Sequence, residues 1–415
     1  MKPGSESMSI STGVHAGRIA ARPQRGFAMA SAIEPTVTIV RTLAEAEAAW
    51  RWLEARDAVP PFQCYDWVRI WLEEIGLARA VEPLIAIGRR GPDLVFLWPL
   101  MVVREGAVRV GRWLGDRNAN YNPGLYAPGE RARTTRETIA SALDEIARTA
   151  AIDCYHLERQ PRVWAGSGNA LATIRGSVAS PSNGHVVTLA PRFEQLLARH
   201  PGSHRRKRMR QRERHFEAHG DYRITTAATA GEAAATLAVF LEQKARRFAE
   251  MGVPNVFASA GVAGFLHRMA TETGPNGAPL LRLHALWAGG RIRAVAGTAT
   301  AGDSRSILFL SFANDELARF GPGTTLVYRL VEAGCRDGLA GLDFGVGEEP
   351  YKENWCDQEI ELAETLLPVT LKGHAFAAAT RTALGLKRAV KRNPAAWNLY
   401  RQLRLRTAPL RRGPP

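Results

Sequence analysis

The sequence predicts an α/β protein made of two lobes, with a short extension before them and a basic tail after them. The chain has 415 residues, which is too long for one ordinary hydrophobic core. Segments with helical and strand-like hydrophobic periodicity alternate through the first half, and the second half repeats this alternation without obvious sequence repetition. We therefore expect an extension at residues 1–35, lobes at 36–190 and 191–368, and a tail at 369–415.

The first lobe is expected to contain helices and strands in alternation. Trp67, Ile70 and Trp71 recur at helical spacing, whereas the apolar runs near residue 90 are separated by a turn that contains Gly and Pro. In chain order, the expected elements are helices at 44–55 and 64–76, strands at 83–89, 94–103 and 108–114, a helix at 134–150 and a strand at 152–157.

The second lobe is expected to begin with a basic helix that ends near Gly220. Further along, three β-rich runs with tight turns form a meander, and a glycine loop, a helix and another strand follow. In chain order, the expected elements are a helix at 205–218, a strand at 222–226, helices at 230–251 and 261–273, strands at 280–288, 291–301 and 304–312, a helix at 324–337 and a strand at 341–344.

The net charge of +15 is concentrated in two segments rather than spread over the chain. Residues 365–415 contain eleven Lys and Arg and no acid, and residues 205–214 read RRKRMRQRER. The second run lacks the aromatic residues that stack on bases, so we expect no nucleic-acid site there. In the tail, apolar and basic residues alternate, which leaves two alternatives: contact with an anionic membrane or packing against the lobes. Pro394 is expected to divide the tail into two short helices.

Composition also indicates a cellular compartment. No apolar run approaches the length needed to cross a bilayer, and residues 1–35 lack the apolar core of a secretory signal. We expect that extension to be disordered and basic. The four cysteines share no close spacing, which favours reduced thiols over a disulfide or zinc framework. The prediction is a cytoplasmic protein without a metal site, with the tail as a possible peripheral contact at the inner face of the cell membrane.

Two segments carry the expected chemistry. The sequence GLDFGVGEEPYKENW at residues 341–355 is a strand that ends in an acid and turns at glycines, which is where α/β proteins place polar functional side chains. The sequence FGPGTTL at residues 320–326 opens a helix, so free backbone N–H groups can face an anion there.

The order of meander, glycine loop, helix and strand resembles the acyl-CoA N-acyltransferases of the GNAT type. More specifically, most of the chain resembles the bacterial acetyltransferases of cellulose and exopolysaccharide biosynthesis, the CelD/BcsL-type family, which is related to the Fem-type transferases. The matching motifs are RRKR at 205–208, QKARRF at 243–248, FGPG at 320–323, DFGVGEEPYK at 343–352 and, less sharply, FQCYDW at 62–67. This resemblance implies two GNAT-like lobes, each a mixed, mostly antiparallel sheet flanked by helices.

The resemblance also implies a binding loop for the acyl donor, acetyl-CoA. In GNAT enzymes, the pyrophosphate of coenzyme A lies on a loop ahead of a helix, where backbone N–H groups and the helix dipole bind it. The corresponding residues here are Arg319, Gly321, Gly323 and Thr324. The position that carries a basic or amide residue in the GNAT pattern is Ala318 in this chain, with Arg319 displaced by one.

Candidate catalytic residues follow the last predicted strand. Tyr351 is a candidate general acid for the leaving thiolate, and Asp343 or Glu348 is a candidate acceptor for the proton of the nucleophile. Lys352 is a candidate to hold the carbonyl oxygen or a substrate phosphate. A turn cap for Asp343 and a surface ion pair for Lys352 are the structural alternatives.

Candidate substrate-binding residues lie in both halves. Lys244 and Arg247 are three residues apart, which puts them on one side of a helix, where they reach phosphates or face solvent. Asn120 and Tyr121 lie in a polar loop whose amides and aromatic ring suit a sugar, although an ordinary turn explains them too. Members of the resembling family often carry Asp at the position of Asn120.

The resemblance therefore implies a transfer of an acyl group, expected to be acetyl, from acetyl-CoA to an amino or hydroxyl group of a sugar or sugar nucleotide. Two alternatives stay open at this point. One is a Fem-type ligase that uses aminoacyl-tRNA, in which case the basic run at 205–214 follows the RNA backbone. The other is a non-catalytic scaffold at the membrane, which the replacement at Ala318 favours.

Overall fold

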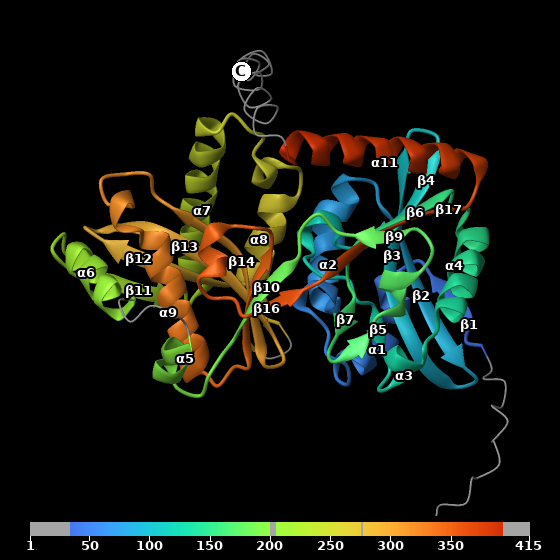
Figure 1. Ribbon diagram of the computed structural model, residues 1–415, viewed down its shortest axis with the longest axis horizontal. Coiled ribbons are helices and arrows are strands. Elements are labelled where there is room, and N and C mark those ends of the chain that lie inside the picture. The colour runs from blue at the N-terminus through green and yellow to red at the C-terminus, as the bar shows by residue number, and fades with distance from the viewer. Residues whose placement is uncertain (1–33, 200–204, 275–276, 393–415) are drawn as a thin grey trace, which may run out of the picture. The chain divides into compact units, whose positions relative to one another are not determined.

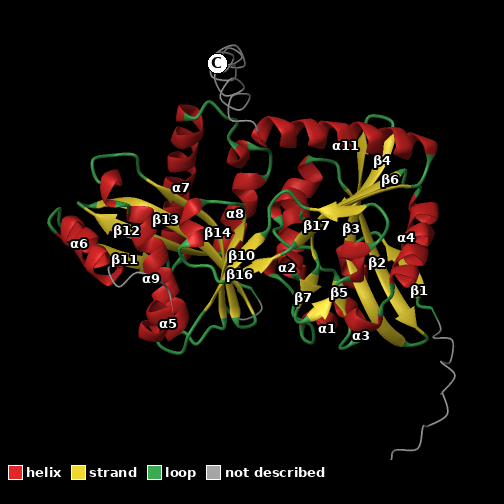
Figure 2. Ribbon diagram, in the orientation of Figure 1, coloured by secondary structure: helices red, strands yellow, loops and turns green. Residues whose placement is uncertain are grey.

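The computed structural model describes residues 34–199, 205–274 and 277–392 and arranges them in two α/β lobes (Figures 1 and 2). Both lobes belong to one compact unit that begins at Pro35. Local sequence explains many element boundaries: Thr42 and Glu45 form a reciprocal capping box at the first helix, and Pro322 occupies the first turn of a later one.

The elements of the first half follow the predicted order closely. In chain order they are β1 (Thr36–Val40), α1 (Leu43–Glu54), η1 (Pro61–Gln63), α2 (Tyr65–Trp71), η2 (Leu72–Gly76), β2 (Glu82–Arg90), β3 (Asp93–Glu105), β4 (Val108–Trp113), η3 (Asp116–Asn118), β5 (Leu125–Tyr126), α3 (Glu130–Arg133), α4 (Arg136–Ala150), β6 (Cys154–Pro161), β7 (Val163–Trp164), β8 (Ser167–Gly168), η4 (Ala170–Thr173) and β9 (Ser177–Ala179). The helix predicted at 64–76 continues from α2 into η2, a π-helical turn.

The second half adds the predicted meander, glycine loop and helix. Its elements are β10 (Gly184–Thr188), α5 (Phe193–Arg199), α6 (Arg205–Glu217), β11 (Arg223–Thr226), α7 (Ala230–Glu250), η5 (Val256–Ala258), α8 (Val262–Thr271), β12 (Arg282–Ala288), β13 (Arg291–Ala301), β14 (Ser304–Phe312), η6 (Ala318–Phe320), α9 (Pro322–Arg336), β15 (Gly341–Val346), α10 (Pro350–Glu353), β16 (Gln358–Ile360), β17 (Leu362–Pro368) and α11 (Leu371–Arg392).

The two main sheets share one pattern of strand pairing (Figure 2). The first has the order β1-β2-β3-β4-β6-β17-β9, with β5 on β3, and the second has the order β11-β12-β13-β14-β15-β10-β16. In both sheets the fourth and fifth strands are parallel, β4 with β6 and β14 with β15, and the other pairs are antiparallel. The predicted fold class, two lobes with mixed, mostly antiparallel sheets flanked by helices, is confirmed.

The sheets do not follow the predicted lobe boundaries, because each half of the chain gives one strand to the other. β10 precedes residue 190 but pairs with β15 in the second sheet, and β17 precedes residue 368 but pairs with β6 in the first. A strand next to the parallel pair can come from any part of the chain that reaches that edge. Neither strand is among the predicted ones, and hydrophobic periodicity does not name the partner of a strand, so the sequence could not show that β10 and β17 cross the predicted boundaries at 190 and 368.

The helices α7 and α9 cover opposite faces of the second sheet. Val295 belongs to the hydrophobic cluster under α7, whereas its neighbours Ala294 and Ala296 belong to the cluster under α9. Alternate residues of a strand point to opposite faces, so both faces of β13 are buried. The central strands are thereby covered on both sides, and their ends remain available for a site.

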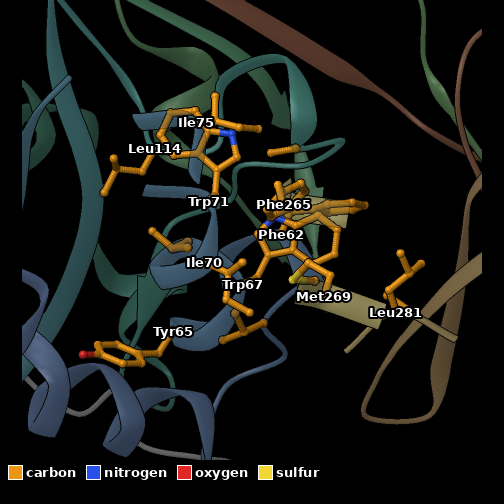
Figure 3. Packing of buried hydrophobic residues seen from close by; sticks show 14 of the residues in the cluster. Phe62, Tyr65, Trp67, Ile70, Trp71, Ile75, Leu114, Phe265, Met269 and Leu281 are labelled. Carbon is orange, nitrogen blue, oxygen red and sulfur yellow. The ribbon is translucent and has the colours of Figure 1, made fainter. Parts of the chain in front are cut away.

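A continuous hydrophobic core joins the lobes. Trp67 of α2 packs edge-on against Phe265 of α8, with ring centroids 5.4 Å apart, and Figure 3 shows residues of both lobes in the same cluster. Ion pairs flank this contact: Arg268 lies 2.7 Å from Glu73, and Arg69 lies 3.4 Å from Glu272. This shared core holds the walls of any site between the lobes in a fixed arrangement.

The described part of the tail is one helix, α11, which packs on the first lobe over β17, β6 and β4 (Figure 1). Ala377 is buried against Cys154 and Leu366, and Lys372 lies 3.4 Å from Asp153. Residues 371–385 therefore pack against the first lobe, which was one of the two alternatives for the tail. Pro394 and residues 1–33 lie outside the described residues, as does the rest of the tail. Within the described ranges, no helix is both long and apolar enough to span a membrane.

Candidate functional site

The candidate site lies where β14 and β15 separate. The parallel ladder between these strands joins only three residue pairs, from Ser304 with Gly341 to Ser306 with Asp343. β14 continues to Phe312, and in the described part of the chain its later residues pair only with β13. The strands diverge and leave a pocket of about 580 Å³, lined by residues 307–310 of one strand and 344–346 of the other.

The predicted glycine loop forms one wall of this pocket. Gly321, Gly323 and Thr324 all line it. Gly321 has φ of +68°, a conformation that favours glycine, and α9 begins at the next residue without a side-chain cap. The first N–H groups of α9 therefore lack the usual capping acceptor and, with the helix dipole, favour an anion at this end of the pocket.

Arg319 does not reach the pocket, and another arginine lies closer to the loop. Arg319 is exposed, with its guanidinium carbon 4.8 Å from the centroid of Phe320. Arg212 of α6 instead comes within 3.4 Å of the position that a Cβ atom on Gly321 would occupy. Burial and the neighbouring Arg208 lower the pKa of Arg212. Sequence analysis missed this residue, although Arg208 and Arg212 have the helical spacing that puts both on one face.

Asp343 is buried at the point where the strands separate. Its Oδ1 accepts hydrogen bonds from Tyr121 Oη and Gly345 N, both at 2.7 Å, and its Oδ2 accepts one from Ser306 Oγ at 2.9 Å. Burial raises the pKa of Asp343, and these hydrogen bonds partly oppose that shift. A carboxyl group enclosed by three donors and only 3% exposed is not placed to take a proton directly from a substrate. The three hydrogen bonds instead tie the end of β15 to the first lobe and to β14, and the role of Asp343 in proton transfer stays a prediction.

Tyr121 and Asn120 bring the first lobe into the site of the second. Tyr121 is 2% exposed, and burial together with the Asp343 carboxyl raises its pKa well above the ordinary value, so its phenol stays neutral and donates to that carboxyl. Asn120 lines the pocket, and its Nδ2 lies 2.9 Å from the position of a Cβ atom on Gly345. Gly345 has φ of +74°, so this close approach depends on glycine.

Lys352 lines the pocket but has no free donor for a substrate. Its Nζ donates to the carbonyl oxygens of Gly345 and Gly347, both at 3.1 Å, and lies 2.7 Å from Glu349 Oε2. An ammonium group has three donors, and these three partners use all of them. In this arrangement Lys352 fixes the turn after β15, and its contact with substrate stays a prediction.

The acid that faces the pocket is Glu349 rather than Glu348. Glu349 lines the pocket, whereas Glu348 is exposed and lies 3.3 Å from His185 Nε2 on β10. Adjacent residues in an extended turn point in different directions, and the sequence gives two equivalent acids there. The sequence therefore held no signal that separates them. Tyr351 follows in α10, but its side chain lies outside the described residues, so its role stays a prediction.

Lys244 and Arg247 lie at different distances from the pocket. Lys244 lines it, with Nζ 5.9 Å from the ring centroids of Phe240 and Phe257, and burial together with Arg247 lowers its pKa. Arg247 is exposed, lies 3.8 Å from Glu250 and lines a neighbouring cavity of about 520 Å³. Of this pair, only Lys244 borders the pocket between β14 and β15.

A larger cleft of about 1380 Å³ adjoins the pocket. Both cavities are lined by Asn120, and they share an apolar wall made of Val256, Phe257, Leu308 and Phe309. Residues of the first lobe such as Trp67 form the other side of the cleft. Two ligands, one in each cavity, would therefore meet near Asn120. Among the described residues, no group of three or more His, Cys, Asp and Glu is arranged to hold a metal ion.

Comparison with known proteins matches this geometry to one fold. The family model described as acetyltransferase (GNAT) domain matches residues 203–353, which include the meander, the glycine loop, α9 and β15. Over these residues the second lobe is similar to a GNAT domain. No curated protein sequence matches the chain significantly.

Solved structures extend the likeness to both lobes. The crystal structure of FemX has a TM-score of 0.53 at 11% identity, covering 80% of this chain and 97% of that one. A conserved protein of unknown function from Bacteroides thetaiotaomicron gives 0.50 at 11% identity, covering 80% and 100%. The C-terminal domain of a putative lysylphosphatidylglycerol synthetase from Agrobacterium fabrum also gives 0.50 at 11%, covering 83% and 98%. At this identity the likeness establishes the fold of the two lobes, and the CelD/BcsL-type assignment stays a prediction.

Proposed function

We propose that this protein is an acyl-CoA-dependent acyltransferase in which the second lobe binds the acyl donor and the adjoining cleft binds the acceptor. The observation that carries the proposal is the pocket between β14 and β15, which has the uncapped start of α9 at one wall and Asn120 at another. A phosphate group at the helix start and an acyl group between the strands suit the chemistry of these two walls.

In the proposed reaction, an amino or hydroxyl group of the acceptor attacks the carbonyl carbon of the acyl thioester. A new C–N or C–O bond forms as the C–S bond breaks, and the proton of the nucleophile is balanced by protonation of the leaving thiolate. Because Asp343 is enclosed, we assign the proton-accepting role to Glu349, which lines the pocket. Tyr351 remains the proposed general acid. Holding both substrates in adjoining cavities lowers the entropic part of the barrier.

The finer assignments rest on the family resemblance. It supports acetyl as the acyl group, and a sugar or polysaccharide precursor in cellulose or exopolysaccharide biosynthesis as the acceptor. It also supports a cytoplasmic reaction near the inner face of the membrane. Contact of residues 393–415 with an anionic membrane would be tested by liposome sedimentation of the full chain beside a chain that ends at residue 392. Equal sedimentation of the two chains would remove the membrane contact from the proposal.

The donor is tested by calorimetry with acetyl-CoA, free coenzyme A and aminoacyl-tRNA as parallel ligands. We expect micromolar binding of acetyl-CoA, on the order of 8 kcal/mol, and a loss of at least roughly tenfold in Gly323→Val. A Cβ atom at residue 323 would lie 3.4 Å from Phe312, so the larger valine narrows the pocket. The matched control is Gly231→Val, at an exposed position in the first turn of α7.

The same titrations separate the alternatives. Binding of aminoacyl-tRNA without binding of acetyl-CoA would move the protein to the Fem-type ligases, with the basic face of α6 on the RNA. Binding of neither ligand would favour a scaffold. The general acid is tested by Tyr351→Phe, which is expected to lower turnover while the affinity for acetyl-CoA stays unchanged. An unaltered rate would remove Tyr351 from the mechanism.

A further inference from the structure

The charges that line the larger cleft do not cancel. Five arginines and three carboxylates belong to its lining, namely Arg79, Arg104, Arg112, Arg117, Arg159, Glu82, Glu105 and Asp116. Each carboxylate has an arginine partner in the same cleft: Arg79 lies 2.8 Å from Asp116, Arg104 lies 3.8 Å from Glu82, and Arg112 pairs with Glu105. Arg117 and Arg159 form no ion pair with any described residue. The cleft therefore carries two uncompensated guanidinium groups.

Arg159 is held in an unusual position for a cation. Its φ is +57°, in a region that residues with a β-carbon rarely adopt, and its Nη1 donates to the carbonyl oxygens of Arg117 at 3.1 Å and Ala119 at 2.5 Å. Burial lowers the pKa of Arg159, because the guanidinium has lost solvent without gaining a bonded carboxylate. The same bonds place Arg117 next to Arg159 and fix the loop that carries Asn120.

The rest of the lining suits a sugar ring. Phe257 and Phe309 provide apolar surface beside Asn120, and Trp67 lines the same cleft. Faces of sugar rings pack on aromatic side chains, and their hydroxyl groups accept hydrogen bonds from amides and indoles. The apolar wall lies on the side shared with the donor pocket. The two arginines without an ion-pair partner among the described residues belong to the first lobe.

We propose that the acceptor is a phosphorylated sugar, whose phosphate binds Arg117 and Arg159 while its ring lies on the aromatic wall and its nucleophile faces Asn120. Two guanidinium groups in one cleft match the double negative charge of a phosphate monoester, and each can donate to two of its oxygens. This assignment deepens the proposed function and rests on it for the acyl transfer, whereas the phosphate site itself stands on the cleft residues.

The test is calorimetry of the full chain, saturated with coenzyme A, with glucose, glucose 1-phosphate and UDP-glucose. We expect glucose 1-phosphate to bind at least roughly tenfold more tightly than glucose. Arg117→Ala should remove this difference, and because Arg117 is exposed the variant should keep its melting temperature. Arg104→Ala is the matched control, since it removes an arginine of the same cleft whose side chain is 71% exposed and lies 3.8 Å from Glu82.

The outcomes separate this inference from the proposed function. Equal binding of glucose and glucose 1-phosphate, or a loss in Arg104→Ala equal to that in Arg117→Ala, would overturn the phosphate site. If acetyl-CoA binds but no sugar does, the acceptor class is wrong while the donor site stands. If sugar phosphates bind through Arg117 but acetyl-CoA does not bind, the acyltransferase proposal fails and the phosphate site stands. Tighter binding of UDP-glucose than of glucose 1-phosphate would identify a nucleotide-linked sugar, and equal binding a free sugar phosphate.

Discussion

The two sheets have the same strand order but differ in what occupies the gap that opens where their two parallel strands separate. In the first lobe, β4 and β6 pair only at Val110 with Cys154 and Gly111 with Tyr155, and in the second lobe β14 and β15 pair over three residues. In both lobes the strands then separate. In the second lobe this gap forms a pocket whose wall includes the glycine loop.

The first lobe closes its gap with its own chain. The loop after β4 folds back on β6: Asn122 N donates to Arg159 O at 2.9 Å, and Asn122 Nδ2 donates to Glu158 O at 3.1 Å. Arg159 in turn holds the carbonyl groups of Arg117 and Ala119. The loop that fills the first gap is thus the loop that presents Asn120 and Tyr121 to the second lobe. The first lobe thus positions residues of the site in the second lobe.

The helix that follows the gap strand, α4 in the first lobe and α9 in the second, is capped in the first lobe and uncapped in the second. α4 begins after Thr135, whose hydroxyl accepts from Thr138 N at 3.2 Å, so a side chain occupies the helix start. α9 begins after Gly321 without such a cap. A capped start is closed to an external anion and an uncapped one is open to it. The comparison teaches that one architecture becomes a binding lobe when its gap and its helix start are both left free.

The largest effect is expected where the two lobes meet, at Gly345→Ala. A β-carbon there would lie 2.9 Å from Asn120 Nδ2, and the left-handed backbone adds a penalty of about 1–2 kcal/mol. Displacement of Asn120 should lower turnover by about 100-fold, because small misplacements of reacting groups have effects of that order. Turnover measurements test the displacement of Asn120, and thermal unfolding measures the backbone penalty. Gly338→Ala is the control, because Gly338 is a left-handed glycine in open space. Equal losses of turnover in the two variants would contradict the role of Asn120.

A smaller effect is expected for Tyr121→Phe, which removes the hydrogen bond that ties the first-lobe loop to Asp343. Loss of one donor to a buried carboxyl group should lower the free energy of unfolding by about 1–3 kcal/mol. Because the loop also carries Asn120, the Michaelis constant for the acceptor should rise while the affinity for acetyl-CoA is kept. Chemical denaturation and calorimetry measure these quantities. If donor affinity falls as much as acceptor affinity, the division of tasks between the lobes is wrong.

Thr135→Ala tests the closed helix start of the first lobe. Loss of the cap should lower the free energy of unfolding by about 1 kcal/mol and leave the binding of acetyl-CoA unchanged, because that helix start belongs to the supporting lobe. The converse variant is Gly321→Ser, which adds a capping hydroxyl group at the start of α9. We expect it to weaken the binding of acetyl-CoA. Weaker donor binding in Thr135→Ala would show that the first lobe also takes part in binding the donor.

The smallest effect is expected in the pH dependence of Asp343→Asn. Burial raises the pKa of Asp343 above its ordinary 3.8, so the folded protein holds this proton to a higher pH than the unfolded chain does. The corresponding stability is present below the ordinary pKa and is lost as pH rises through the raised one. Asparagine has no such proton. The free energy of unfolding of the natural protein, minus that of Asp343→Asn, should therefore fall as the pH rises above about 4, the ordinary pKa of the group. A difference that rises with pH would indicate that the hydrogen bonds outweigh burial.

The sequence by itself determined the longer helices, the strands of the meander and the glycine loop. Periodicity, caps and turns are local properties, so the meander, the Gly321 turn and the α9 helix could be predicted from neighbouring residues. The sequence also placed Gly323, Thr324, Lys244 and Asn120 among the candidates, and the structure brings them to one pocket.

The tertiary structure alone decided which strands pair and which side chains face the pocket. β10 and β17 join the sheet of the other lobe because strand pairing does not depend on separation along the chain, and no local pattern names the partner. Glu349 rather than Glu348, and Arg212 rather than Arg319, approach the site because the direction of a side chain depends on the packing of its element. Asp343 is enclosed by Tyr121, a residue of the other lobe, and only the folded chain brings that donor within 2.7 Å.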